Sequence, residues 1–110
     1  MKDLSPSALR RRRLALVRRM PPVERILRGS LIERYKRCGK PGCRCAQGPG
    51  HGPKHYLSVS QAGTLPRMDY VLQEQRAQVE AYLANYRLVR ELLKEIGEIN
   101  RELLCRRERL

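Results

Sequence analysis

Residues 38–55 read Cys38-Gly-Lys-Pro-Gly-Cys43-Arg-Cys45-Ala-Gln-Gly-Pro-Gly-His51-Gly-Pro-Lys-His55. The glycines and prolines of this stretch disfavour regular structure, so we expect a loop. Its three cysteines and two histidines lie within 18 residues, and a structural zinc ion takes four such ligands at about 2.0–2.3 Å. We predict one structural zinc ion bound by Cys38, Cys43, Cys45 and His51.

Other interpretations of the Cys/His stretch remain open. His55 is a reserve ligand, but at the start of a strand it equally suits packing or hydrogen bonding. A single residue separates Cys43 from Cys45, which is a shorter gap than in common zinc sites. Inert structural cysteines are therefore the alternative. The stretch holds no Asp or Glu to serve as a general base or to orient a nucleophile. We therefore predict no enzyme activity, and a packing role for Cys105.

The segments beside the loop have the patterns of β-strands. Leu31, Ile32 and Tyr35 alternate with charged residues after Ser30, which favours a strand, although so short a run is also compatible with a helix. Residues 56–60 and 67–71 alternate apolar with polar side chains around a turn that contains Gly63, and this predicts a β-hairpin. We expect a small antiparallel sheet.

Two helices are predicted before the sheet. Residues 7–19 are rich in helix formers, Ser5 or Ser7 can cap their start, and Pro21-Pro22 ends them. A short second helix is predicted from Val23 to Arg28, with Pro22 at its first position and Gly29 after its end.

A long helix is predicted from Gln73, with apolar residues at alternating spacings of three and four. This heptad pattern is typical of a coiled coil, and Asn100 at an a position favours a homodimer. Leu92 and Ile99 lie beside these a and d positions, which we call the heptad seam, and widen it into an apolar stripe. Alternatively, the stripe covers the chain's own sheet or N-terminal helices. The predicted oligomerisation residues are Val79, Tyr82, Tyr86, Val89, Leu93, Ile96, Asn100 and Leu103.

Together these elements predict an α+β fold of N-terminal helices, a zinc-stapled sheet and a long C-terminal helix. Residues 1–20 form a basic helix or arm, 21–72 hold the short helix, loop and sheet, and 73–110 form the long helix. A chain of 110 residues is expected to make one compact unit.

The charge of the chain is strongly positive and concentrated near the N-terminus. The chain has 24 Lys+Arg against 11 Asp+Glu, and residues 1–37 carry 12 and 3 of them. A positive field of this kind favours a polyanion, so we expect DNA or RNA binding; a solubility tail or an acidic protein partner is the alternative. The predicted nucleic-acid-binding residues are Arg10, Arg11, Arg12, Arg13, Arg18, Arg19, Lys36, Arg37, Lys40 and Arg44.

No targeting or membrane signal is found. The longest apolar run near the N-terminus, Leu14 to Val17, ends at Arg18, which is too short for a signal peptide, and a bilayer span needs about 20 apolar residues. We expect a cytoplasmic protein without membrane partners, in which thiols stay reduced.

Four segments together carry a resemblance: residues 28–35 (Arg-Gly-Ser-Leu-Ile-Glu-Arg-Tyr), the Cys38–Cys45 run, His51-Gly-Pro and Tyr56-Leu-Ser. Over residues 21–104 the chain resembles a bacterial family of uncharacterised small basic proteins. The resemblance implies a short helix, a Cys-rich loop, a small sheet and a long C-terminal helix, and it brings no established activity to this chain. Lys54-His55-Tyr56 departs from the run of aromatic residues that is more usual there.

These patterns favour a nucleic-acid-binding accessory or regulatory protein with structural zinc. Tyr35, Tyr56 and Tyr70 can stack on bases, although tyrosines at strand spacing also serve as half-buried sheet residues. The alternative is a protein-interaction adaptor that works through the long helix, with the basic arm docking on an acidic partner.

Overall fold

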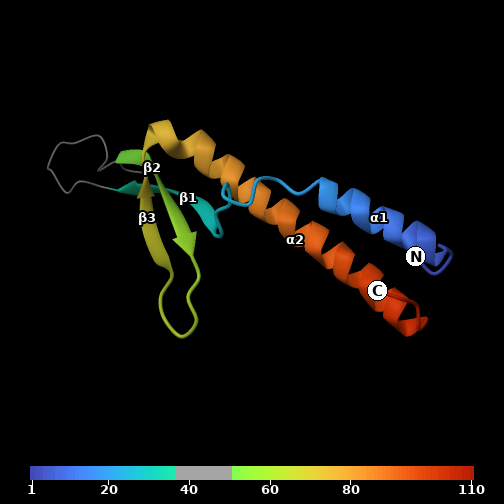
Figure 1. Ribbon diagram of the computed structural model, residues 1–110. Helices are drawn as coiled ribbons and strands as arrows, with labels where there is room; N and C mark the ends of the chain where they lie inside the picture. Colours follow the sequence, from blue (N-terminus) through green and yellow to red (C-terminus); the bar gives the residue numbers. More distant parts are fainter. Residues whose placement is uncertain (37–50) are drawn as a thin grey trace, which may run out of the picture. The chain divides into compact units, whose positions relative to one another are not determined.

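The computed structural model describes residues 1–36 and 51–110 (Figure 1). Its elements are α1 (Pro6–Arg18), β1 (Ser30–Lys36), β2 (His51–Val59), β3 (Arg67–Val71), a 3-10 turn η2 (Gln73–Gln75) and α2 (Arg76–Cys105). The predicted α+β class is confirmed, with one N-terminal helix, a three-stranded antiparallel sheet and a long C-terminal helix. Two compact units result, one of residues 1–26 with 84–110 and one of residues 27–83.

In residues 27–83, β2 is the central strand and pairs antiparallel with both β1 and β3. The register places Leu57 opposite Leu31 on one side. One face of the sheet is buried, since Leu57 and Val71 pack with Leu83 of α2 in an apolar cluster. Val79, one helical turn before Leu83, packs against the same cluster, so the first turns of α2 cover this face.

Strand β2 begins earlier than expected. The sequence predicts a loop through residue 55 and a strand that starts there, but β2 begins at His51, so the predicted end of the loop is wrong. Between the pairs Arg34–Lys54 and Lys36–His51 the register shifts, because β2 has one residue more than β1 there. Such a bulge accommodates Gly52 and Pro53 within a strand, since proline cannot donate to the ladder.

The predicted short helix from Val23 to Arg28 is wrong. The chain makes one turn there, in which the Arg25 amide donates to the Pro22 carbonyl at 3.0 Å, and then continues into β1 without regular structure. Two contacts with α2 use the backbone groups that a helix would need. Asn85 Nδ2 donates to the Arg25 carbonyl at 2.8 Å, and the Leu27 amide donates to the Tyr82 carbonyl at 3.2 Å.

In the other unit, α1 and the C-terminal part of α2 form an antiparallel helical pair (Figure 1). Ser5 is the N-cap of α1 and accepts from the Ala8 amide at 3.1 Å, as expected for a capped start. The core between the helices contains five buried aliphatic side chains. They are Leu9, Leu16, Leu92, Ile99 and Leu103.

The predicted heptad seam is used differently along α2. Leu103 is fully buried and Ile96 packs beside it, while the Asn100 side chain accepts from Arg13 Nη1 at 2.7 Å. The buried stripe is centred on the flanking positions Leu92 and Ile99, and Leu93 is 56% exposed. This C-terminal part of the stripe thus meets an intramolecular partner, and homodimerisation stays a prediction. No helix in the described part of the chain is long and apolar enough to span a bilayer.

Candidate nucleic-acid interface

One face of the sheet carries side chains that the core does not use. Leu31, His55, Leu57 and Val71 face the covered side of the sheet. Because side chains alternate along a strand, the residues next to them in each strand point to the opposite side. We call this side the open face, and none of its described side chains is buried. The open face consists of Ser30, Ile32, Arg34, Lys54, Tyr56, Ser58, Met68 and Tyr70.

Two tyrosines occupy the middle of the open face. Tyr56 on β2 lies opposite Tyr70 on β3, and their rings form an edge-to-face pair with centroids 5.6 Å apart and an interplanar angle of 65°. Pairs of this kind hold each other in defined orientations. Tyr70 is 55% exposed, so the pair presents aromatic surface to a ligand.

A row of positive charge adjoins the tyrosines. Arg34 on β1 lies opposite Lys54 on β2, two residues along from Tyr56, and both cations are exposed. The described acidic residues of the strands, Glu33 and Asp69, have the opposite parity and belong to the other face. Among the described residues, the open face therefore holds cations without a carboxylate.

His55 lies on the covered face of the sheet. It is 3% exposed, and its Nε2 atom lies 3.2 Å from Glu33 Oε1. Glu33 is the register partner of His55 on β1, which explains the contact. Packing and hydrogen bonding, the alternative to its role as a reserve zinc ligand, match this environment.

Of the predicted zinc ligands, only the histidines belong to the residues that the structure describes. Cys38, Cys43 and Cys45 lie outside the described residues, as do Arg37, Lys40 and Arg44. His51 begins β2, and its backbone is the register partner of Lys36 at the end of β1. No cluster of three or more His, Cys, Asp or Glu side chains suited to a metal occurs within residues 1–35 and 53–110.

The arginine run of α1 is largely engaged in contacts with the C-terminal part of the chain. Arg12 pairs with Glu95 of α2, and Arg13 donates to Asn100 Oδ1 and, at 3.0 Å, to the Leu110 carbonyl. Arg10 donates to the Arg109 carbonyl at 2.7 Å. These three guanidinium groups join α1 to the C-terminal half of α2 and to the residues after it, and they are less available to phosphates than the sequence suggests.

The remaining α1 arginines, Arg11, Arg18 and Arg19, are exposed. No hydrogen bond or ion pair of their side chains is found within the described part of the chain. The six predicted phosphate ligands of residues 10–19 thus divide into three that contact the C-terminal part of the chain and three for which the described residues show no such contact.

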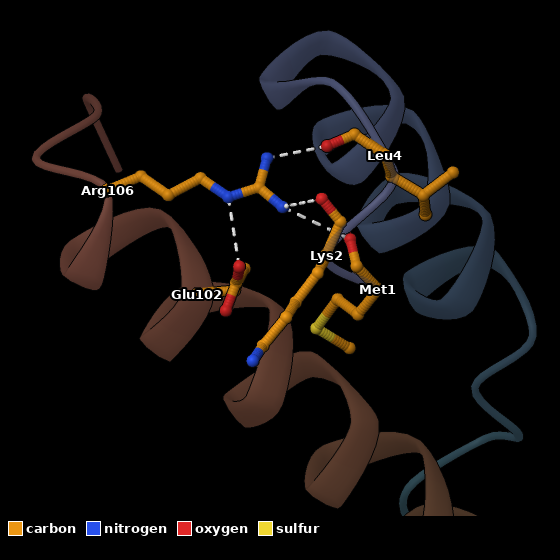
Figure 2. A network of polar contacts seen from close by, with 5 residues as sticks. All are labelled: Met1, Lys2, Leu4, Glu102 and Arg106. Carbon is orange, nitrogen blue, oxygen red and sulfur yellow. Dashed lines mark hydrogen bonds and ion pairs between the residues drawn. The ribbon is translucent and has the colours of Figure 1, made fainter.

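Arg106 shows how far this structural use of arginine extends (Figure 2). Its Nη1 atom donates to the Leu4 carbonyl at 2.5 Å, and its Nη2 atom donates to the carbonyls of Lys2 at 2.8 Å and Met1 at 3.2 Å. Its Nε atom donates to Glu102 at 2.9 Å. One side chain directly after the end of α2 therefore holds the start of the chain in place.

Sequence reasoning missed Arg34 and Lys54. The alternation of charged and apolar residues along β1 and β2 is the signal that could have found them. The signal is incomplete, because only the register of β1 against β2, offset by the bulge at residues 52–53, places the two cations side by side.

Comparisons with known proteins place the chain in a family. A family model with the description "Domain of unknown function (DUF6788)" matches residues 6–81. The match includes α1, the Cys/His stretch and all three strands. No curated protein and no solved structure is detectably similar to the chain. An uncharacterised family was expected from the sequence, and because the match covers more than half of its length, the chain belongs to the DUF6788 family.

Proposed function

We propose that the chain binds single-stranded nucleic acid on the open face of its sheet. The observation that carries this proposal is the Tyr56–Tyr70 pair beside the cations Arg34 and Lys54. Bases stack on aromatic side chains, which contributes about 1–3 kcal/mol per base, and cations along the same surface contact the phosphates. The absence of a described carboxylate on this face favours a polyanion over a neutral ligand.

Single strands suit this face better than a duplex. In a duplex the bases are already stacked on one another, so tyrosines on a flat sheet reach only their edges. In a single strand the faces of the bases are free to stack on side chains. The Arg34–Lys54 pair and the Tyr56–Tyr70 pair lie roughly 7 Å apart along the strand. A base can therefore stack on the tyrosines while its phosphate contacts the neighbouring cations.

A structural zinc ion is the second part of the proposal. The donor set Cys38, Cys43, Cys45 and His51 suits zinc, since thiolates and imidazoles are its usual ligands. The pairing of Lys36 with His51 supports it, because the chain leaves β1 two residues before Cys38 and re-enters the sheet at His51. The metal would hold this end of the sheet, and no catalysis is proposed.

Fluorescence anisotropy with labelled DNA and RNA strands of about 15 nucleotides, near the upper site size of one small module, tests the open face. Replacement of both Tyr56 and Tyr70 by Ala should weaken binding at least roughly tenfold, as expected from lost stacking. Replacement of Arg34 and Lys54 by Gln should lower the slope of log affinity against log salt by about 1.4, for two lost phosphate contacts.

Tyr86→Ala is the matched control, because this tyrosine lies on α2 with its ring 5.9 Å from the guanidinium of Arg90 and outside the open face. Its affinity should equal that of the parent. The proposal fails if the double tyrosine variant binds like the parent, or if a duplex binds as tightly as the single strand.

A further inference from the structure

The helical pair of residues 1–26 and 84–110 exposes large aliphatic side chains on one side. Leu14 and Val17 of α1 are each 49% exposed, and Leu93 and Leu104 of α2 are 56% and 55% exposed. We call these four residues the apolar flank. Single exposed leucines are ordinary on protein surfaces, but a contiguous group marks an interaction site.

Helical spacing and one hydrogen bond place the four residues on the same side. Leu14 and Val17 are three residues apart on α1, so they share a face of that helix. Leu93 lies seven residues before Asn100 and Leu104 lies four after it, so these three residues share a face of α2. Arg13, four residues before Val17, donates to Asn100 at 2.7 Å. This contact joins the apolar face of α1 to that of α2.

The charged residues of α1 and α2 that neighbour the apolar flank are positive; Glu108, four residues after Leu104, lies beyond the end of α2. Arg11, Arg90 and Arg101 each stand three residues before one of its leucines, and Arg18 stands four residues after Leu14. Within α1 and α2, every charged residue three or four positions from a flank residue is an arginine. Since residues at these spacings are neighbours on a helix, a basic rim surrounds the apolar strip.

The acidic residues of the same part of α2 lie on its other side. Glu91, Glu95, Glu98 and Glu102 repeat at spacings of three and four, and Glu95 pairs with Arg12. Glu91, Glu95 and Glu98 line a cavity of about 420 Å³ together with Arg19 and Lys94. The carboxylates of this part of α2 therefore lie away from the apolar flank, on a side of mixed charge.

We infer that the apolar flank docks an amphipathic helix with acidic edges from a partner protein. Two aliphatic ridges on helices packed about 8–10 Å apart form the groove in which the third helix of a bundle lies. Leu104 lies eleven positions after Leu93, a rise of about 16 Å along the helix, which matches three turns of a bound helix. Leucine anchors at helical spacing would enter the groove, and Glu or Asp at the edges would meet the arginines.

Charge decides between the possible occupants. A second copy of this chain would bring the same arginine rim against itself, and like charges across an interface oppose association. Phosphates gain nothing from leucine side chains, so nucleic acid leaves the apolar strip unused. This surface lies outside the open face of the sheet, and the inference is independent of the proposed nucleic-acid function.

The test uses the full chain and a synthetic helical peptide of about five turns, with Leu at i, i+3, i+4 and i+7 and Glu at the flanking positions. Calorimetry should give one peptide per chain, and the same peptide with Lys in place of Glu should bind at least roughly tenfold more weakly, as several rim charges change sign. Replacement of Leu14 and Leu93 by Gln should abolish binding of the acidic peptide, with an unchanged circular dichroism spectrum.

Two further variants make the test specific. Leu65→Gln removes a leucine that is 84% exposed and outside the flank, and it should leave the affinity unchanged. Replacement of Arg90 and Arg101 by Glu should reverse the preference between the acidic and the basic peptide.

Three results would overturn the inference. The first is equal binding of both peptides, which indicates nonspecific adhesion. The second is a dimer in sedimentation that Leu93→Gln dissociates, which assigns the flank to a second copy. The third is binding to vesicles of phosphatidylserine and phosphatidylcholine without binding of the acidic peptide, which assigns it to a lipid surface.

Discussion

At the scale of single residues, Gly29 shows a requirement that comes from packing. Its φ is +136°, and a Cβ atom built there would lie 2.6 Å from the carbonyl oxygen of Ser58. The sequence predicts Gly29 as the end of a short helix, but the residue instead lets the chain enter β1 against the backbone of β2. Only glycine combines this φ with so close an approach.

Gly29→Ala should therefore lower the free energy of unfolding by at least about 2 kcal/mol, from backbone strain and the clash with Ser58. Gly97→Ala is the matched control, because Gly97 is in the middle of α2 and a Cβ there meets nothing within 4 Å. Alanine in a helix is more favourable than glycine, so this control should gain about 0.5–1 kcal/mol. Urea unfolding measures both, and a Gly29→Ala protein as stable as the parent would contradict the role of the close approach.

At the scale of elements, α2 shows that a heptad pattern does not identify the buried face. Leu92 and Ile99 are 2% and 0% exposed, whereas Leu93, a predicted seam residue, is 56% exposed. The helix carries more apolar residues than one stripe needs, so two registers of the pattern fit the sequence. Leu9 and Leu16 of α1 select the register that contains Leu92 and Ile99.

Ile99→Ala should cost about 2–4 kcal/mol of unfolding free energy, since it leaves a cavity in the core of the helical pair. Leu93→Ala should change it by less than about 0.5 kcal/mol, as is usual for an exposed site. Thermal and urea unfolding at two protein concentrations checks both. If Leu93→Ala is the more damaging change and its effect depends on concentration, the seam serves a dimer.

At the scale of the whole molecule, the positive charge is divided among distinct tasks. Arg12 and Arg106 hold parts of the chain together, whereas Arg34 and Lys54 on the open face are exposed. A net charge of +13 thus overstates the charge that is free for a polyanion. It still creates a long-range positive field, which attracts such a ligand.

Zinc binding is also a property of the whole chain, because metal affinity and folding are linked in small domains. Protein purified without chelator should contain one zinc per chain, and chelation should lower its melting temperature. Cys43→Ser should lose the metal, whereas Cys105→Ser should keep it. Cys105, at the end of α2, is exposed, so its predicted packing role is wrong. Metal-free protein with an unchanged melting curve would refute the zinc site.

The sequence by itself determined the types of the main elements. The cap at Ser5, the alternation in residues 67–71 and the helical pattern after Gln73 are local signals, and α1, β3 and α2 follow them. Local signals suffice there because capping and side-chain alternation depend on neighbours in the chain.

Only the tertiary structure decided the bulge at residues 52–53, the pairing of Arg34 with Lys54 and the part of the α2 stripe that is buried. It also decided that the segment before β1 is not helical, and that Arg10, Arg12 and Arg13 bind the C-terminal part of the chain. Each of these depends on a partner far along the chain, and the free energy of that long-range contact outweighs the local preference.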